Sequence, residues 1–270
     1  MCLSAKHRRP IVYRCGRCGN IELQHDCPPD TAMPTFLRPQ ENAPPWANDC
    51  LSTLGSRIDD ESYPCFYARS ARLVARFVEV PIEQAAPLIG RFIEEYLQLI
   101  GSINNLRERA YVLLVVFFPP TTAPAPMTDY WQGFWGAVGE LLDGDPCEWP
   151  SSIPFDPETP NWSFCFGGVP IFINVNTPAH HRRRSRNLGR SLTLIFQPRE
   201  GLDLVSPPDW RGDGIRTEIR ARITNYDSLP ASPDLASYGS PSNRDWRLYF
   251  LPDNEEGFRT ECPLTSRSKS

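Results

Sequence analysis

Two adjacent histidines and four arginines lie within seven residues of the segment NVNTPAHHRRRSRNLG (174–189). His180 and His181 are half of the four histidines in the chain, and a neutral imidazole nitrogen can bind a metal ion or a haem iron. Guanidinium groups bind carboxylates or phosphates through paired hydrogen bonds. These residue types allow a haem site, a site for a phosphate-bearing ligand, or a solvated basic loop with nothing bound. The four arginines are Arg182, Arg183, Arg184 and Arg186.

A cysteine in the segment YPCFYARSA (63–71) is a second candidate for chemistry. Cys65 is followed by Arg69 and Arg72, and a thiolate near cations can be a nucleophile or an axial ligand of haem iron. A cysteine between a proline and aromatic residues can equally be a small core residue. Cys165, in the segment SFCFGG, has the same two interpretations.

The first 48 residues differ from the rest of the chain. They carry a CxxC pair followed by a histidine and a cysteine, and then a proline-rich stretch. Thiolates and imidazole are zinc ligands, but the histidine and the last cysteine stand closer together than in the usual zinc motifs. We divide the chain into a Cys- and Pro-rich N-terminal extension (1–48), with or without zinc, and one domain (49–270). The four residues are Cys15, Cys18, His25 and Cys27.

The composition excludes several classes of protein. The chain has 270 residues, a net charge of −4 and 40% hydrophobic residues, which is ordinary for a globular protein. A mildly acidic chain is not expected to bind nucleic acid. There is no run of about 18 apolar residues, so we expect no membrane span. The N-terminus lacks the apolar stretch of a secretory signal, and we expect a cytoplasmic protein.

Hydrophobic periodicity gives the elements that would position these residues. Helices are expected at 62–80, 82–103, 128–146 and 211–227, and strands at 110–120, 162–168, 170–176, 191–200 and 245–254. The two strands around Gly167 and Gly168 should form a hairpin, and the basic segment becomes the loop after the second of them. Helices come mainly first and strands second, which favours a mixed α/β (α+β) single domain with helices around one antiparallel-rich sheet.

Several segments together resemble the YqcI/YcgG family. They are WPSSIPFDPETPNWSFCFGGVPIFINVNTPAHHRRRSRNLGRSLTLIFQPRE (149–200), IRTEIRARITNYD (215–227) and YGSPSNRDWRLYFLPDNEE (238–256). The segment YPCFYAR is similar to the family's upstream Pro-Cys motif, and the resemblance extends over about residues 50–257. Characterised members are haem-dependent N-oxygenases that hydroxylate a nitrogen of arginine or related guanidino compounds. The basic loop is most similar to that of the arginine N-hydroxylases of D-cycloserine-type biosynthesis.

The resemblance implies a set of cofactors, partners and site residues. It implies non-covalent haem b, because no CxxCH attachment motif is present, with dioxygen and an external electron donor as co-reactants. It implies His180 as the iron ligand, with His181 as the alternate, although some relatives carry a histidine where this chain has Thr177. Cys65 and the four loop arginines are the other expected cofactor contacts. A homodimer is one possible oligomeric state.

An arginine substrate carries a permanent positive charge, so a carboxylate should face it. The first candidates are Glu148, Asp156 and Glu158, in the loop before strand 162–168, and each could instead be a solvated surface residue. Asp129 and Glu140 are further candidates. Three other functions stay open: a haem-binding or sensing protein without turnover, an N-hydroxylase of another amine or guanidine, and a non-haem domain that binds a phosphate at the arginine loop.

Overall fold

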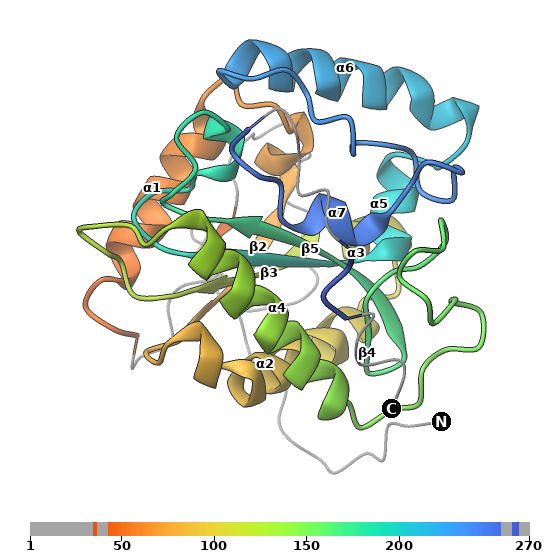
Figure 1. Ribbon diagram of the computed structural model, residues 1–270, viewed down its shortest axis with the longest axis horizontal. Helices are drawn as coiled ribbons and strands as arrows, with labels where there is room; N and C mark the ends of the chain where they lie inside the picture. Colours follow the sequence, from red (N-terminus) through yellow and green to blue (C-terminus); the bar gives the residue numbers. More distant parts are fainter. Residues whose placement is uncertain (1–34, 37–42, 255–260, 265–270) are drawn as a thin grey trace.

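The fold is built on one mixed β-sheet with helices on both of its faces (Figure 1). The computed structural model describes residues 35–36, 43–254 and 261–264. The strand order is β1-β2-β3-β6-β5-β4. The strands are β1 (Thr35–Phe36), β2 (Arg72–Phe77), β3 (Val112–Phe117), β4 (Cys165–Phe166), β5 (Val169–Asn176) and β6 (Thr193–Pro198).

The sheet is richer in antiparallel than in parallel pairs. Within the described residues, β1 pairs with β2 and β2 with β3 in parallel, whereas β3–β6, β6–β5 and β5–β4 are antiparallel. The predicted α+β class with one antiparallel-rich sheet is confirmed. The prediction that β3 is buried on both faces is confirmed. Leu114 packs in the hydrophobic cluster on one face of the sheet, and Val115 packs in the cluster on the other face.

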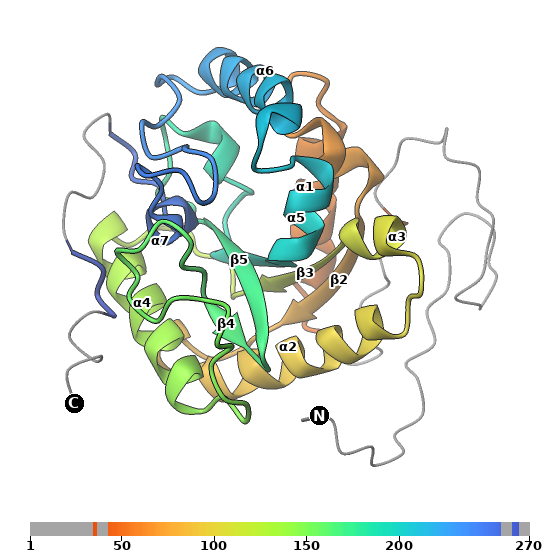
Figure 2. The same ribbon diagram turned by 90° about the vertical axis from the view of Figure 1, so that its right-hand side faces the viewer.

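The helices divide between the two faces of the sheet. Figure 2 shows α2 and α4 on one side, and α1, α5 and α6 on the other. The α-helices are α1 (Ala47–Asp59), α2 (Ala86–Gly101), α3 (Leu106–Ala110), α4 (Met127–Asp143), α5 (Arg199–Val205), α6 (Trp210–Tyr226) and α7 (Asp245–Tyr249). Short 3-10 helices lie at η1 (Phe66–Ser70), η2 (Ile82–Gln84) and η3 (Arg184–Arg186). No helix in the described part of the chain is long and apolar enough to cross a membrane.

Most of the predicted elements are confirmed. The helix expected at 82–103 is α2, and Pro87 lies in its first turn, where a missing N–H costs nothing. The expected hairpin is β4–β5, and its turn uses Gly167 and Gly168 with φ values of 62° and 75°, which favour glycine. The helix at 128–146 is α4, and Pro126 precedes it as the N-cap.

Two predicted elements are wrong. The helix expected at 62–80 is η1 followed by strand β2. Leu73 packs toward α1 and Val74 toward α2, so burial on alternating faces of a central strand overrides the helical spacing. The segment 245–254 was expected to be a strand, but its first residues form the helix α7. One helical turn brings Asp245 and Tyr249 together, and the Tyr249 hydroxyl donates to the Asp245 carboxylate at 3.1 Å.

The expected zinc residues Cys15, Cys18, His25 and Cys27 lie outside the described residues. The interpretation of Cys165 as a core residue is supported, because its side chain is fully buried within β4. Burial raises the pKa of its thiol to about 12, which keeps the sulfur protonated at neutral pH.

Candidate functional site

His180 uses both of its ring nitrogens inside the protein. Its Nε2 lies 2.7 Å from the carbonyl oxygen of Leu251, and a carbonyl only accepts, so Nε2 carries the proton. Its Nδ1 therefore accepts, and it lies 2.9 Å from the hydroxyl oxygen of Thr177 and 3.3 Å from the Thr177 backbone nitrogen. In this arrangement neither nitrogen is free for a metal. Burial lowers the pKa of His180 to about 4, which keeps the ring neutral.

The next three backbone amides of the basic loop bind one carboxylate. The N–H groups of His181, Arg182 and Arg183 donate to Asp253 at distances between 2.6 and 3.0 Å. Successive backbone amides that converge in this way form an anion-binding nest. The nest therefore holds the C-terminal segment that contains Leu251 and Asp253, and the imidazole of His181 stays exposed at the surface.

The two buried arginines of the loop bind backbone carbonyls. Arg183 donates to the carbonyls of Pro230, Pro252 and Asn254. Arg186 donates to the carbonyls of Leu248 and Tyr249. Burial lowers the pKa of Arg186 to about 10, so both guanidinium groups stay charged at neutral pH. Their donors fix the loop conformation.

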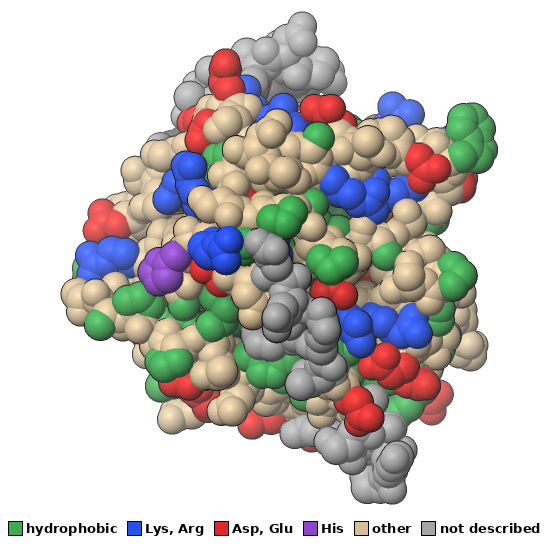
Figure 3. Space-filling view, turned by 45° about the horizontal axis from the view of Figure 1, so that its top comes forward, with side chains coloured by type: hydrophobic (Ala, Val, Ile, Leu, Met, Phe, Trp, Pro, Cys, Tyr) green, Lys and Arg blue, Asp and Glu red, His purple; other side chains and the backbone are tan. Residues whose placement is uncertain are grey.

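The other two arginines of the loop are exposed. Arg182 reaches the carbonyl of Ser228 at 3.5 Å, and the guanidinium of Arg184 lies over the ring of Tyr226 at 4.7 Å. Figure 3 shows histidine beside Lys or Arg side chains on one face of the molecule. The loop thus presents a small basic surface, while its buried residues clamp the segment from 248 to 254.

Cys65 lies in a different place, at an apolar cavity between the sheet and the helices α1, α5 and α6. The cavity has a volume of about 220 Å³ and is lined mainly by aliphatic and aromatic side chains. Leu73, Val115 and Ile195 contribute to its sheet wall, and Leu54 and Leu202 to its helical walls. An apolar hollow with few polar groups is the usual form of a small-molecule site.

Cys65 is exposed and lines this cavity. Removal from water raises the pKa of the thiol, while the backbone amides of Ala68 and Tyr67 and the guanidinium of Arg222 lower it. The cation near Cys65 is thus Arg222 of α6. Arg69, which precedes β2, donates instead to the carbonyls of Ile58 and Asp59.

Arg222 also holds the chain that leads to Cys65. Its guanidinium donates to the carbonyls of Glu61, Tyr63 and Pro64 at distances between 2.8 and 3.2 Å. The rings of Tyr63 and Tyr226 meet edge to face at 5.7 Å. Helix α6 therefore contacts the cysteine segment through Arg222 and through the ring of Tyr226.

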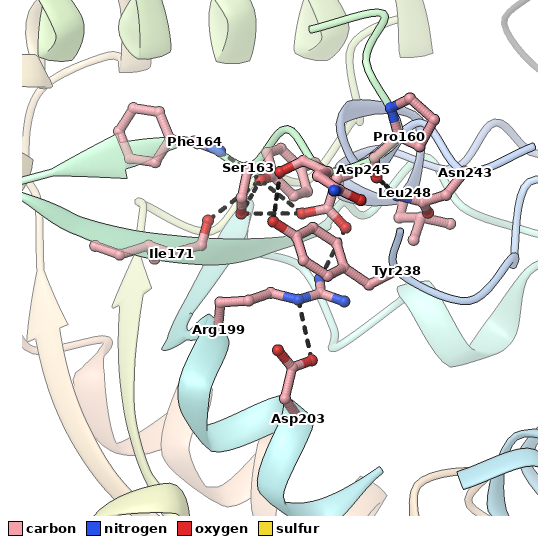
Figure 4. Close-up of polar contacts among 12 residues, drawn as sticks. Pro160, Ser163, Phe164, Ile171, Arg199, Asp203, Tyr238, Asn243, Asp245 and Leu248 are labelled. Atoms are coloured by element: carbon pink, nitrogen blue, oxygen red, sulfur yellow. Dashed lines mark hydrogen bonds and ion pairs between the residues drawn. The ribbon is translucent and has the colours of Figure 1, made fainter. Parts of the chain in front are cut away.

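A buried ionic network anchors α5 and α7 against β5 (Figure 4). The carboxylate of Asp245 is fully buried and accepts from Arg199 at 2.8 Å and from the Ser163 hydroxyl at 3.1 Å. The guanidinium of Arg199 also lies 3.3 Å from Asp203 and 3.8 Å above the ring of Tyr238. A buried carboxylate needs such partners, and together they fix the position of α5, which forms a wall of the cavity.

None of the predicted substrate carboxylates lines the Cys65 cavity. Glu148 and Asp156 are exposed, and Asp156 accepts the backbone N–H of Glu158 at 2.9 Å. Glu158 is half-buried and accepts from the indole N–H of Trp246 and from Arg244. The further candidates Asp129 and Glu140 lie on α4, on the opposite side of the sheet.

The structure separates the predicted site residues into two groups. The loop residues from His180 to Arg186 hold the C-terminal segment, and Cys65 lies at the cavity. Arg186 connects the two, because it donates at 3.0 Å to the side-chain oxygen of Asn174, which lines the cavity. Asn174 and Gln197 are cavity residues that the sequence reasoning missed. The sequence signal that could have identified them is a single polar residue on an otherwise apolar strand face, Asn174 in FINVN and Gln197 in TLIFQP.

Comparison with known proteins places the chain in a family. The model of the YqcI/YcgG family matches residues 54–265. The chain belongs to the YqcI/YcgG family. It is 34% identical, over 82% of its length and 85% of the relative, to a protein of Streptomyces lavendulae named "Putative N(omega)-hydroxy-L-arginine synthase DcsA". It is 32% identical to the uncharacterized protein YqcI of Bacillus subtilis (strain 168), over 83% of the chain and 90% of the relative. No solved structure matches it.

Proposed function

We propose that this protein is a haem-dependent N-hydroxylase that acts on L-arginine. In the reaction an N–H of the guanidino group becomes N–OH. One oxygen atom of dioxygen enters the product and the other leaves as water, with two electrons from an external donor and two protons. The name of the Streptomyces lavendulae relative supports arginine as the substrate.

The observation that carries the cofactor proposal is the position of Cys65 at an apolar cavity. A porphyrin is a large apolar ring, and a cysteine thiolate is one of the axial ligands of haem iron. When bound, haem supplies the activation of dioxygen. The polypeptide would hold the cofactor, orient the substrate and exclude water from the site.

Cys65 is the residue that we propose as the axial ligand. Burial raises the pKa of the Cys65 thiol, and the amides of Ala68 and Tyr67 and the guanidinium of Arg222 oppose this shift. Binding to a metal would release the thiol proton. His180 offers no free nitrogen, and His181 does not line the cavity. The histidine ligand stays a prediction, and the experiment below decides between it and Cys65.

The size of the cavity indicates which wall must move for haem to bind. Small-molecule sites commonly have volumes of about 300–1,000 Å³, and this cavity has about 220 Å³. One weakly buried wall is α6: of its 17 residues only Gly212 and Tyr226 are buried. Displacement of α6 from the sheet would enlarge the cavity without opening the core beneath α2 and α4. It would have to keep the hydrogen bonds of Arg222 to the segment before Cys65.

Absorption spectra of the purified protein test the cofactor. We expect a Soret band and, for the reduced protein with carbon monoxide, the spectrum of a thiolate-ligated haem. Cys65→Ala should lose most of the haem, whereas His181→Ala should keep it. Loss of haem in both His181→Ala and His180→Gln, with haem retained in Cys65→Ala, would assign the ligand to the loop instead.

Product analysis tests the activity. Arginine, dioxygen and a reductant should give a product heavier by one oxygen atom, and the same incubation without dioxygen should give none. If arginine returns unchanged from haem-loaded protein and leaves the Soret band unmoved, the hydroxylase proposal fails. A haem-binding or sensing protein is then the function that the spectra support.

A further inference from the structure

The sheet wall of the Cys65 cavity carries two amide side chains. Asn174 of β5 and Gln197 of β6 line the cavity beside apolar neighbours such as Phe172 and Ile195. No charged side chain lines this cavity within the described part of the chain. Both amides are half-buried. An amide that loses contact with water needs a hydrogen bond in return, so two of them on an otherwise apolar strand face need an explanation.

The orientation of Asn174 is fixed by its partner. Arg186 donates to the Asn174 side-chain oxygen at 3.0 Å. A guanidinium has donors and no acceptor, so this oxygen cannot be exchanged with the amide nitrogen. The Asn174 Nδ2 group, with two N–H donors, therefore remains for the cavity.

The orientation of Gln197 is fixed in the opposite sense. Its Nε2 donates to the carbonyl of Ala110 at 2.9 Å, and a carbonyl has no proton to give. The Gln197 Oε1 acceptor therefore remains for the cavity. The buried side-chain atoms without a hydrogen-bond partner, within the described residues, do not include the Gln197 Oε1 or the Asn174 Nδ2. These two atoms are therefore exposed, and both can be reached from the cavity.

The two amides are neighbours on the sheet. In the β5–β6 register, Asn174 pairs with Ile195 and Phe172 pairs with Gln197. Asn174 and Gln197 are thus diagonal neighbours on one face, at a Cα separation of about 7–8 Å or less. The cavity wall presents a donor and an acceptor at a spacing that one small molecule can span.

We propose that Asn174 and Gln197 recognise the two ends of the substrate. Gln197 Oε1 accepts an N–H of the guanidino group, and Asn174 Nδ2 donates to the α-carboxylate of the same molecule. The substrate class is a free amino acid with a guanidino side chain, bound through neutral amides instead of the carboxylates Glu148, Asp156 or Glu158. This proposal rests on the proposed function of the same cavity.

The chemistry of the pair gives it selectivity. A compound without the oxygen acceptor, such as agmatine, leaves the Asn174 donors unpaired when it fills the cavity. A site built to form a hydrogen bond rejects an analogue that lacks the partner, because a buried polar group is then left unsatisfied. Arginine should therefore bind more tightly than agmatine.

Two substitutions separate the roles of the amides. Asn174→Asp keeps an oxygen for Arg186 but replaces the donor nitrogen by a charged acceptor that repels a carboxylate. Gln197→Met keeps the length of the side chain and removes the acceptor. The matched controls are Asn104→Asp and Gln132→Met, because both residues are exposed and neither lines the cavity.

Isothermal titration of the purified full chain with L-arginine and with agmatine is the test, and circular dichroism confirms that each variant is folded. We expect Gln197→Met to weaken both ligands about tenfold, which equals about 1.4 kcal/mol. Asn174→Asp should weaken arginine about tenfold or more and leave agmatine unchanged or tighter. The controls should match the wild type.

The outcomes distinguish this proposal from the function on which it rests. Wild-type affinity for arginine in both folded variants, or no arginine binding to haem-loaded wild-type protein, overturns the recognition proposal and leaves the haem proposal standing. Protein that contains no haem, but binds arginine and loses it in the two variants, supports the recognition proposal and removes the haem proposal.

Discussion

His180 and Leu251 are 71 residues apart in the chain and are joined by a hydrogen bond of 2.7 Å between the imidazole Nε2 and the backbone carbonyl. The bond fixes the tautomer of a histidine that is buried and neutral. It also ties the loop after β5 to the segment that follows α7. The pair explains why the loop sequence is rich in donors: its buried side chains and its backbone amides point at the C-terminal segment.

The first prediction concerns pH and His180. The pKa of His180 is lowered from 6.5 to about 4 by burial, so the unfolded state takes up a proton before the folded state does. Stability should be complete above pH 6.5 and fall as the pH drops toward 4, by about 1.4 kcal/mol per pH unit. Chemical denaturation at a series of pH values measures this slope.

His180→Gln is the comparison for that slope. Glutamine can donate to the Leu251 carbonyl but cannot titrate, so the difference between wild type and variant isolates the histidine from the carboxylates that titrate below pH 5. Parallel curves for the two proteins between pH 6.5 and 4 would contradict the assignment.

The second prediction concerns the anion nest. Asp253→Ala leaves the amides of His181, Arg182 and Arg183 without their carboxylate, and we expect a loss of stability of about 3 kcal/mol, because hydrogen bonds to charged groups contribute about 1.5–3 kcal/mol each and water replaces part of them. Urea denaturation measures it. Asp59→Ala, at an exposed aspartate, should change stability by less than about 0.5 kcal/mol; equal effects of the two substitutions would exclude a special role for the nest.

The third prediction concerns Arg222 and the sulfur of Cys65. Arg222→Gln removes a cation that lowers the pKa of the thiol and frees the carbonyls that lead to Cys65. In haem-loaded protein, the carbon monoxide spectrum should lose thiolate character. The control is Arg220→Gln, on the same helix, whose guanidinium binds the carbonyl of Leu235 instead. A spectrum that changes in both variants, or in neither, would argue against this role.

The fourth prediction concerns α6 as the movable wall. Hydrogen exchange followed by mass spectrometry, with and without haem, should show altered protection in peptides from Trp210–Tyr226. Peptides from α4, whose inner face is buried against the sheet, should exchange equally in both states. Altered protection in α4 with none in α6 would mean that the cofactor enters from the other side of the sheet.

The sequence predicted the elements whose pattern is local. The apolar run of β3, the glycine turn of β4–β5 and the amphipathic α2 each carry their own signal. It failed for β2 and α7. Alternate residues of β2 are buried by different helices, and α7 depends on Asp245 meeting Arg199, which is 46 residues away. Such burial and pairing are properties of the assembled chain.

The residues of the candidate site likewise include some that the sequence could identify and some that it could not. Cys65 was recognised as a residue that could do chemistry; it lines an apolar cavity, and its chemical role stays a prediction. The role of His180 was not visible, because its partner Leu251 is an ordinary backbone carbonyl without a side-chain signature. Asn174 and Gln197 lie on different strands, and only the β5–β6 register brings them together.

The order of synthesis determines when the hydrogen bonds of Arg186 can form. Arg186 orients Asn174, but two of its other hydrogen bonds are to the carbonyls of Leu248 and Tyr249. A nascent chain that has emerged only to residue 240 already contains all the strands found in the described residues, yet it lacks these carbonyls. Arg186 can form these two hydrogen bonds only after that segment has been synthesised. The ligand-recognising wall is therefore completed at the end of synthesis, and a prematurely terminated chain could form its sheet without gaining a selective binding site.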